Sequence, residues 1–154
     1  MAHPSTTFRF LAEPTDVNFG GNVHGGIVMK WIDQAGYACA TQWSGNYCVT
    51  VYVGGIRFLK PILIGNLVEV QAKVIYTGRT SMHISIDVLA SNPMDSKLEK
   101  TTHCIIIFVA IDDDGRPTQT PKWIPKTKED KELEKYAKKL MDLREEISQE
   151  MKNR

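Results

Sequence analysis

The segment NFGGNVHGGIVMKWIDQAGYACAT, residues 18–41, decides the fold expected for this 154-residue chain. Its first nine residues contain two Asn and four Gly, a composition typical of a loop. From residue 27 to about residue 41, apolar residues recur every three or four positions, which predicts an α-helix. Apolar side chains occupy most of the circumference, so we expect this helix to be largely buried.

Five other segments have the composition and periodicity of β-strands: residues 6–12, 47–59, 67–76, 82–88 and 101–111. Gly54 and Gly55 interrupt the second segment and predict a bulge or bend there. In the third segment, strict alternation places five residues on one face, namely Val68, Val70, Ala72, Val74 and Tyr76. One strand, a long helix and four further strands predict an α+β domain with an antiparallel sheet, spanning residues 1–125.

The tail, residues 126–154, carries charges of both signs and an apolar residue at every third or fourth position. This pattern predicts a C-terminal amphipathic helix with a narrow apolar stripe. The helix has three possible roles: packing on the body, mediating assembly, or fraying in solution. We favour packing within an oligomer. One long helix covers only part of a sheet, and a dimer would cover the rest.

Composition narrows the class of protein. Hydrophobic residues make up 42%, charged residues 24%, and the formal net charge is +1, which argues against a nucleic-acid-binding protein. Three cysteines without metal-ligand spacing indicate buried, reduced thiols and a reducing compartment. Residues 1–9 lack the apolar run of a signal peptide, and no window is long and apolar enough to span a membrane. We therefore expect a cytoplasmic protein that does not bind membranes.

The start of the predicted helix could support chemistry. Gly25 and Gly26 have no Cβ, so a ligand can approach their backbone amides, which carry the positive end of the helix dipole. Such a site favours an anion or a carbonyl oxygen that gains negative charge. An interpretation of equal weight is that the two glycines only allow tight packing at the start of the helix. Asp33 follows Gly26 by seven residues, which places it on nearly the same helix face. The alternative to a catalytic role is a structural one, in which the Asp33 carboxylate pairs with Lys30.

Two polar residues near the glycines are weaker candidates for a role in the reaction. The amide of Asn18 can donate and accept hydrogen bonds, which suits positioning of a water or a carbonyl, but Asn is also common in turns. His24 has a side chain that titrates near neutral pH, yet a histidine beside a helix start is more often structural. The sequence contains no phosphate-binding or dinucleotide-binding glycine motif, nucleophile elbow or metal-ligand cluster. We expect no metal or organic cofactor.

Several separated motifs resemble the acyl-CoA hydrolase branch of the hotdog thioesterases, over roughly residues 8–125. The resemblance rests on PTDVN at residues 14–18, GNVHGG at 21–26, WID at 31–33, FLKPI at 58–62 and GRTSM at 78–82. It implies a hotdog fold, in which a five-stranded antiparallel sheet wraps around the long helix. It also implies hydrolysis of acyl-CoA to CoA and a fatty acid by a homodimer, with three dimers often forming a hexamer.

The resemblance further implies a role for each candidate. Asp33 becomes the general base or nucleophile, Asn18 its partner from the other subunit, and the Gly26 N–H the group that polarises the thioester carbonyl. The residues expected to shape the site and hold CoA are His24, Gly25, Arg57, Lys60, Arg79, Thr80 and Ser81. Two other functions stay open: a hotdog hydratase acting on an enoyl thioester through His24 and Asp33, and a non-catalytic acyl-CoA sensor.

Overall fold

The computed structural model describes residues 3–95 and 97–154. Met1 and Ala2, with which the predicted domain begins, lie outside the described residues. The elements are β1 (Ser5–Leu11), the short 3-10 helix η1 (Pro14–Asp16), α1 (Gly25–Ser44), β2 (Tyr47–Phe58), β3 (Leu67–Thr77), β4 (Ser81–Ser91), β5 (Glu99–Ile111) and α2 (Lys128–Lys152). All five predicted strands and both predicted helices are present.

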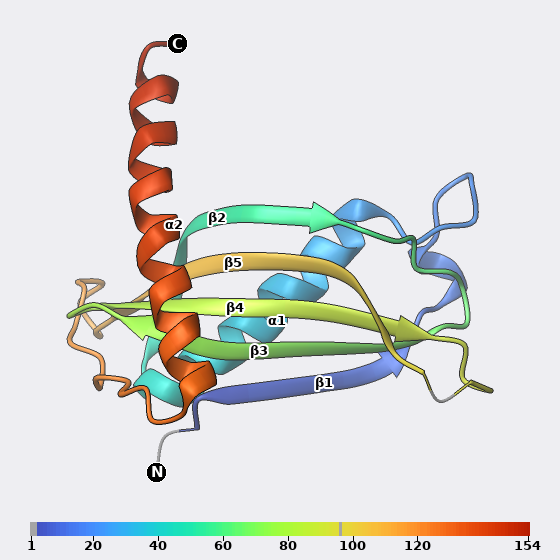
Figure 1. Cartoon of the computed structure of the whole chain (residues 1–154), viewed down its shortest axis with the longest axis horizontal. Helices are drawn as coiled ribbons and strands as arrows, with labels where there is room; N and C mark the ends of the chain where they lie inside the picture. The colour runs from blue at the N-terminus through green and yellow to red at the C-terminus, as the bar shows by residue number, and fades with distance from the viewer. Residues whose placement is uncertain (1–2, 96) are drawn as a thin grey trace.

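The five strands form one sheet in the order β1-β3-β4-β5-β2, and every neighbouring pair is antiparallel. Helix α1 lies behind the sheet, while α2 crosses its front face (Figure 1). The predicted α+β class, with an antiparallel sheet wrapped around a long helix and an extra C-terminal helix, is confirmed. β1 and β2 are the two edge strands, so β2 leaves one side of its backbone without a strand partner among the described residues.

Helix α1 extends beyond the predicted range at both ends. His24 is its N-cap, and Gly45 ends it in a left-handed conformation (φ 72°), donating its N–H to the carbonyl of Thr41. The face toward the sheet is buried, and at Gly36 the approach is so close that a Cβ would lie 2.9 Å from the ring of Phe108.

The expectation that α1 is largely buried is wrong for a single chain. Met29, Asp33 and Tyr37 are exposed, because the sheet contacts one side of the helix only. The opposite side of α1 therefore remains open, next to the free edge of β2.

The pattern of β3 is interrupted by a bulge. Val68, Val70, Ala72 and Val74 all face the α1 side and are fully buried, as the alternation predicts. The pairing with β4 shifts register between Val74 and Tyr76. The prediction for Tyr76 is therefore wrong: it packs on the α2 side of the sheet. The bulge predicted at Gly54 and Gly55 is confirmed by a register shift in β2 and by φ 62° at Gly55.

Helix α2 begins at a Thr127 cap, whose hydroxyl accepts a hydrogen bond from the Asp130 N–H. Its first half packs on the outer face of the sheet, where Leu133, Ala137 and Leu140 meet Ile75, Ile105 and Tyr76. The first of the three predicted roles, packing on the body, thus applies to this half. The second half extends past β2, beyond the edge of the sheet (Figure 1).

Candidate functional site

The loop before α1 is held by Asn18. Its Oδ1 accepts hydrogen bonds from the backbone N–H of Gly20 (2.9 Å) and of Asn22 (3.2 Å), while its own N–H donates to the Asn22 carbonyl (2.7 Å). This is the turn arrangement that the sequence left open as an alternative. The side-chain NH₂ group makes no hydrogen bond within the described part of the chain, so Asn18 can still donate to a ligand.

The first turn of α1 presents free backbone donors. The N–H groups of Ile27 and Val28 both donate to the His24 carbonyl, at 3.0 and 3.1 Å. The N–H groups of Gly25 and Gly26 have no backbone acceptor among residues 3–95 and 97–154. A Cβ on Gly26 would meet nothing within 4 Å, so the helix surface at this residue is not covered by other parts of the described chain. The His24 side chain is exposed and makes no capping hydrogen bond.

Asp33 lies two turns further along α1, on the exposed side of the helix. Its Oδ1 accepts a hydrogen bond from the Oγ1 of Thr50 in β2, at 3.1 Å. The alternative partner Lys30 forms no ion pair with Asp33 in the described structure. Asp33 is therefore held by a neutral donor at the edge of the sheet.

Sequence reasoning missed Thr50. A threonine in a strand is ordinary, because β-branched residues favour strands whether or not they have another role. Its contact with Asp33 depends on how β2 runs back along α1 and on the register shift between Thr50 and Tyr52. No local pattern contains that information.

Asn18 lines a cavity that Asp33 does not line. A cavity of about 270 Å³ brings Asn18 and Gly25 together with Lys60. The other lining residues are Asn22, Val23, Val28, Phe58, Leu59, Pro61, Ile62 and Thr102. Asp33 is not among the residues that line this space.

The residues predicted to hold CoA fall into two groups. Arg57 lies near the end of β2, opposite His103. Lys60 lies just beyond the strand, with its Nζ 2.7 Å from Glu99 Oε2. Arg79 and Thr80 directly precede β4, and Ser81, its first residue, pairs with Val109. His103 and Val109 are six residues apart on β5, so the groups lie roughly 20 Å apart. The two groups are therefore separated within one chain by most of the length of β5.

The cysteines offer no activated nucleophile. Burial raises the pKa of Cys39 to about 12 and that of Cys104 to about 11, and it also raises the pKa of Cys48. All three thiols are free and buried, in agreement with the prediction for their side chains. No group of three or more His, Cys, Asp or Glu residues suited to a metal ion occurs among the residues that the structure describes. Within the same residues, no helix has the length and apolarity to cross a membrane.

Residues 20–97, about half of the chain, match the model of the Thioesterase superfamily. The chain belongs to this superfamily. Among curated proteins, it is 37% identical over 117 residues to the acyl-CoA thioester hydrolase YciA of Salmonella typhimurium, covering 73% of this chain and 87% of that one. Family membership agrees with the resemblance found in the motifs around residues 18–33.

Solved structures extend the likeness to the whole chain. The acyl-CoA hydrolase of Staphylococcus aureus, solved with butyryl-CoA and CoA, is 26% identical with a TM-score of 0.89, covering 97% of this chain and 91% of that one. The hexameric thioesterase y2039 of Yersinia pestis is 36% identical with a TM-score of 0.69, covering 75% and 93%. Variants of the S. aureus enzyme replace single Asn, Asp and Thr residues by Ala, at positions separated by 15 and 17 residues.

Proposed function

We propose that this protein is an acyl-CoA thioester hydrolase whose reaction depends on Asp33. The observation that carries the proposal is the likeness to acyl-CoA hydrolases, at 37% identity in sequence and a TM-score of 0.89 in structure. In addition, Asn18, Asp33 and Thr50 are separated by 15 and 17 residues, the spacing of the three residues replaced in the S. aureus variants.

Asp33 is the group that acts on the thioester. Its carboxylate either takes a proton from a water that attacks the carbonyl carbon, or attacks that carbon itself and is then released by water. In both routes a C–O bond forms, the C–S bond breaks, and CoA leaves as the thiol. The hydroxyl of Thr50, 3.1 Å from Asp33 Oδ1, keeps the carboxylate in one orientation.

The free amides at the start of α1 stabilise the carbonyl oxygen as it gains negative charge. The Gly26 N–H has no backbone acceptor within the described residues and is available to a ligand. A donor that is fixed before the reaction need not reorganise during it, which is why such groups contribute strongly to catalysis. Gly25 and His24 shape this turn.

The complete site requires two chains. Asp33 does not line the cavity that holds Asn18, whereas it does contact Thr50 on the edge strand β2. Tyr47, Val51 and Val53 leave 43–62% of their surface exposed along this edge. Pairing of two β2 edges would cover these residues and bring Asn18 of one subunit toward Asp33 of the other.

A site formed by two subunits also explains why the predicted CoA-binding residues lie in two separate groups within one chain. Arg57 and Lys60 at one end of β5, and Arg79 with Thr80 and Ser81 at the other, can serve one CoA molecule when they come from different subunits. The hexameric state of the related Y. pestis thioesterase supports a trimer of dimers as the full assembly. Three buried free thiols support a reducing, cytoplasmic location.

The test is release of free thiol from acyl-CoA substrates of short, medium and long chain. We expect hydrolysis by the natural protein and its loss in Asp33→Asn, which keeps the size of the side chain. A Lys30→Gln protein, changed one turn away on the same helix, is the control for local disturbance. Tight binding of acyl-CoA without thiol release would favour a sensor, and a change in the double bond of enoyl-CoA without thiol release would favour a hydratase.

A further inference from the structure

Helix α2 carries an apolar stripe that continues past the sheet of its own chain. The stripe consists of Leu133, Ala137, Leu140, Ile147 and Met151, with Arg144 at the remaining position. The spacings alternate between four and three residues, which is the pattern of a seam that packs along its whole length. Leu133, Ala137 and Leu140 contact the outer face of the sheet, whereas Ile147 is 51% exposed and Met151 70% exposed.

The point at which α2 leaves the sheet is marked by Arg144. Its guanidinium lies 4.5 Å from the centre of the Tyr52 ring, on the edge strand β2. Eight residues of helix follow Arg144, up to Lys152. They extend about 12 Å, which equals two to three strand spacings of about 4.8 Å. The second half of α2 thus has the length to cover two further strands beyond β2.

An open groove lies beneath this projecting half. Its volume is about 630 Å³, and one wall is formed by Val51, Tyr52 and Val53 of β2. The other wall is formed by Arg144, Ile147, Ser148, Met151 and Lys152 of α2. A strand added to the free edge of β2 would lie in this groove, with α2 above it.

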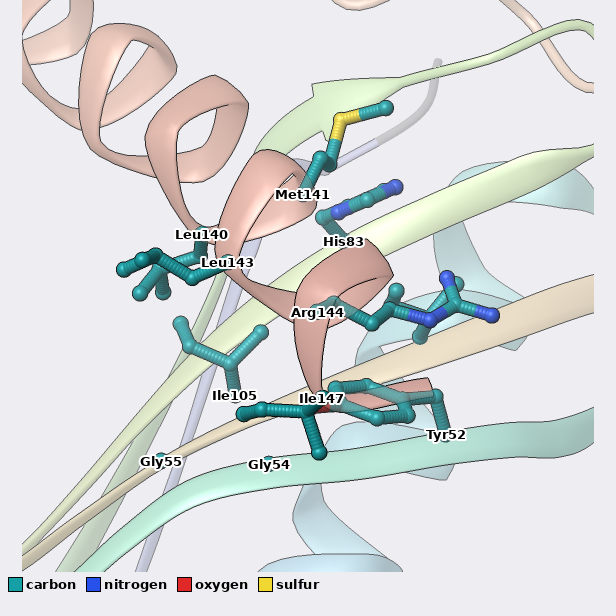
Figure 2. A pocket seen from close by; sticks show the side chains of 11 residues that line it. Tyr52, Gly54, Gly55, His83, Ile105, Leu140, Met141, Leu143, Arg144 and Ile147 are labelled. Atoms are coloured by element: carbon teal, nitrogen blue, oxygen red, sulfur yellow. The ribbon is translucent and has the colours of Figure 1, made fainter. Parts of the chain in front are cut away.

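A second space lies beside the groove, between α2 and the glycine bulge of β2. It has a volume of about 140 Å³, and Gly54 and Gly55 contribute no side chains to fill it (Figure 2). Leu143 and Ile147 line it from the helix side. An apolar space of this size weakens the packing between helix and sheet unless other side chains enter it.

We propose that the second half of α2 packs on the partner subunit, across the seam between the two β2 strands, and clamps the dimer. Two antiparallel β2 edges are related by a twofold axis perpendicular to the sheet. Both α2 helices then lie on the same outer face and run in opposite directions. Each covers the partner's β2 with Ile147 and Met151, and side chains of the partner enter the groove. The placement of α2 rests on the β2 seam proposed above for the composite site.

The first test measures assembly and not hydrolysis. The double variant Ile147→Gln with Met151→Gln should raise the dimer dissociation constant at least about tenfold in sedimentation experiments, because it removes four apolar side chains from each dimer. The control, Glu145→Ala with Gln149→Ala, alters exposed residues on the opposite face of the same turns and should leave the dimer unchanged. Circular dichroism verifies that the helix is retained. Unchanged dimerisation, or loss of hexamers with intact dimers, would overturn the clamp.

The second test reports the position of the helix in a folded dimer. In a Met151→Cys protein the new thiol is the accessible one, because the three natural cysteines are buried. Its reaction with a maleimide should be at least about tenfold slower in the dimer than after dilution to monomers. A dimer in which this thiol reacts at the monomer rate overturns the clamp and leaves the seam intact. A protein that is monomeric at every concentration overturns both.

Discussion

The hydrogen bond between Thr50 and Asp33 allows a sharp test of the proposed chemistry. Thr50→Val removes the hydroxyl but keeps the shape and strand preference of the side chain. A hydrogen bond to a charged group contributes about 1.5–3 kcal/mol, and each 1.36 kcal/mol changes a rate tenfold. We expect kcat for thiol release to fall about 10- to 150-fold. KM should change little, because Thr50 holds the carboxylate and not the substrate.

Two further proteins show whether Thr50 acts through Asp33. Thr50→Ser keeps a hydroxyl and should retain most of the activity. In an Asp33→Asn background, Thr50→Val should have little additional effect on the residual rate, since the charged acceptor is already lost. Melting temperatures of all variants should match within a few degrees, because Thr50 is exposed in the single chain. Full activity of Thr50→Val, or independent effects of the two changes, would refute the role of this contact.

Three other predictions concern stability and the oxyanion donor. Burial lowers the pKa of His83 to about 4, so the neutral ring stabilises the fold above about pH 6.5, and this contribution is lost as the pH falls toward 4. The melting temperature should thus decrease from pH 7 to pH 5, and less so in His83→Gln; equal decreases would contradict this. Gly36→Val should lower the free energy of unfolding by about 1–3 kcal/mol in urea titrations, since a Cβ there lies 2.9 Å from Phe108, and an unchanged midpoint would argue against the close packing. Gly26→Ala should remain active, because its Cβ meets nothing within 4 Å, whereas Gly26→Pro removes the N–H and should reduce kcat about 100-fold; equal activity of the two would exclude this donor.

The order of elements could be predicted because each element leaves a local signature. The three-to-four spacing of residues 27–41 gave a helix, and the alternation in β3 identified four buried residues from Val68 to Val74. These patterns depend only on the periods of 3.6 and 2 along the chain. The prediction failed at Tyr76, one residue past a bulge, because one extra residue reverses the face of everything that follows it.

For the candidate site, too, the sequence predicted some features and the tertiary structure decided the others. The sequence by itself determined that free amides and a carboxylate occupy one side of a single helix, since Gly26 and Asp33 are seven residues apart. Only the tertiary structure decided that Thr50 is the partner of Asp33, that Asp33 does not line the cavity that holds Asn18, and that Arg57 and Arg79 are at opposite ends of β5. Contacts of this kind depend on how strands pair and how a helix crosses them. Register, bulges and packing of the whole chain set that geometry, and no short segment encodes it.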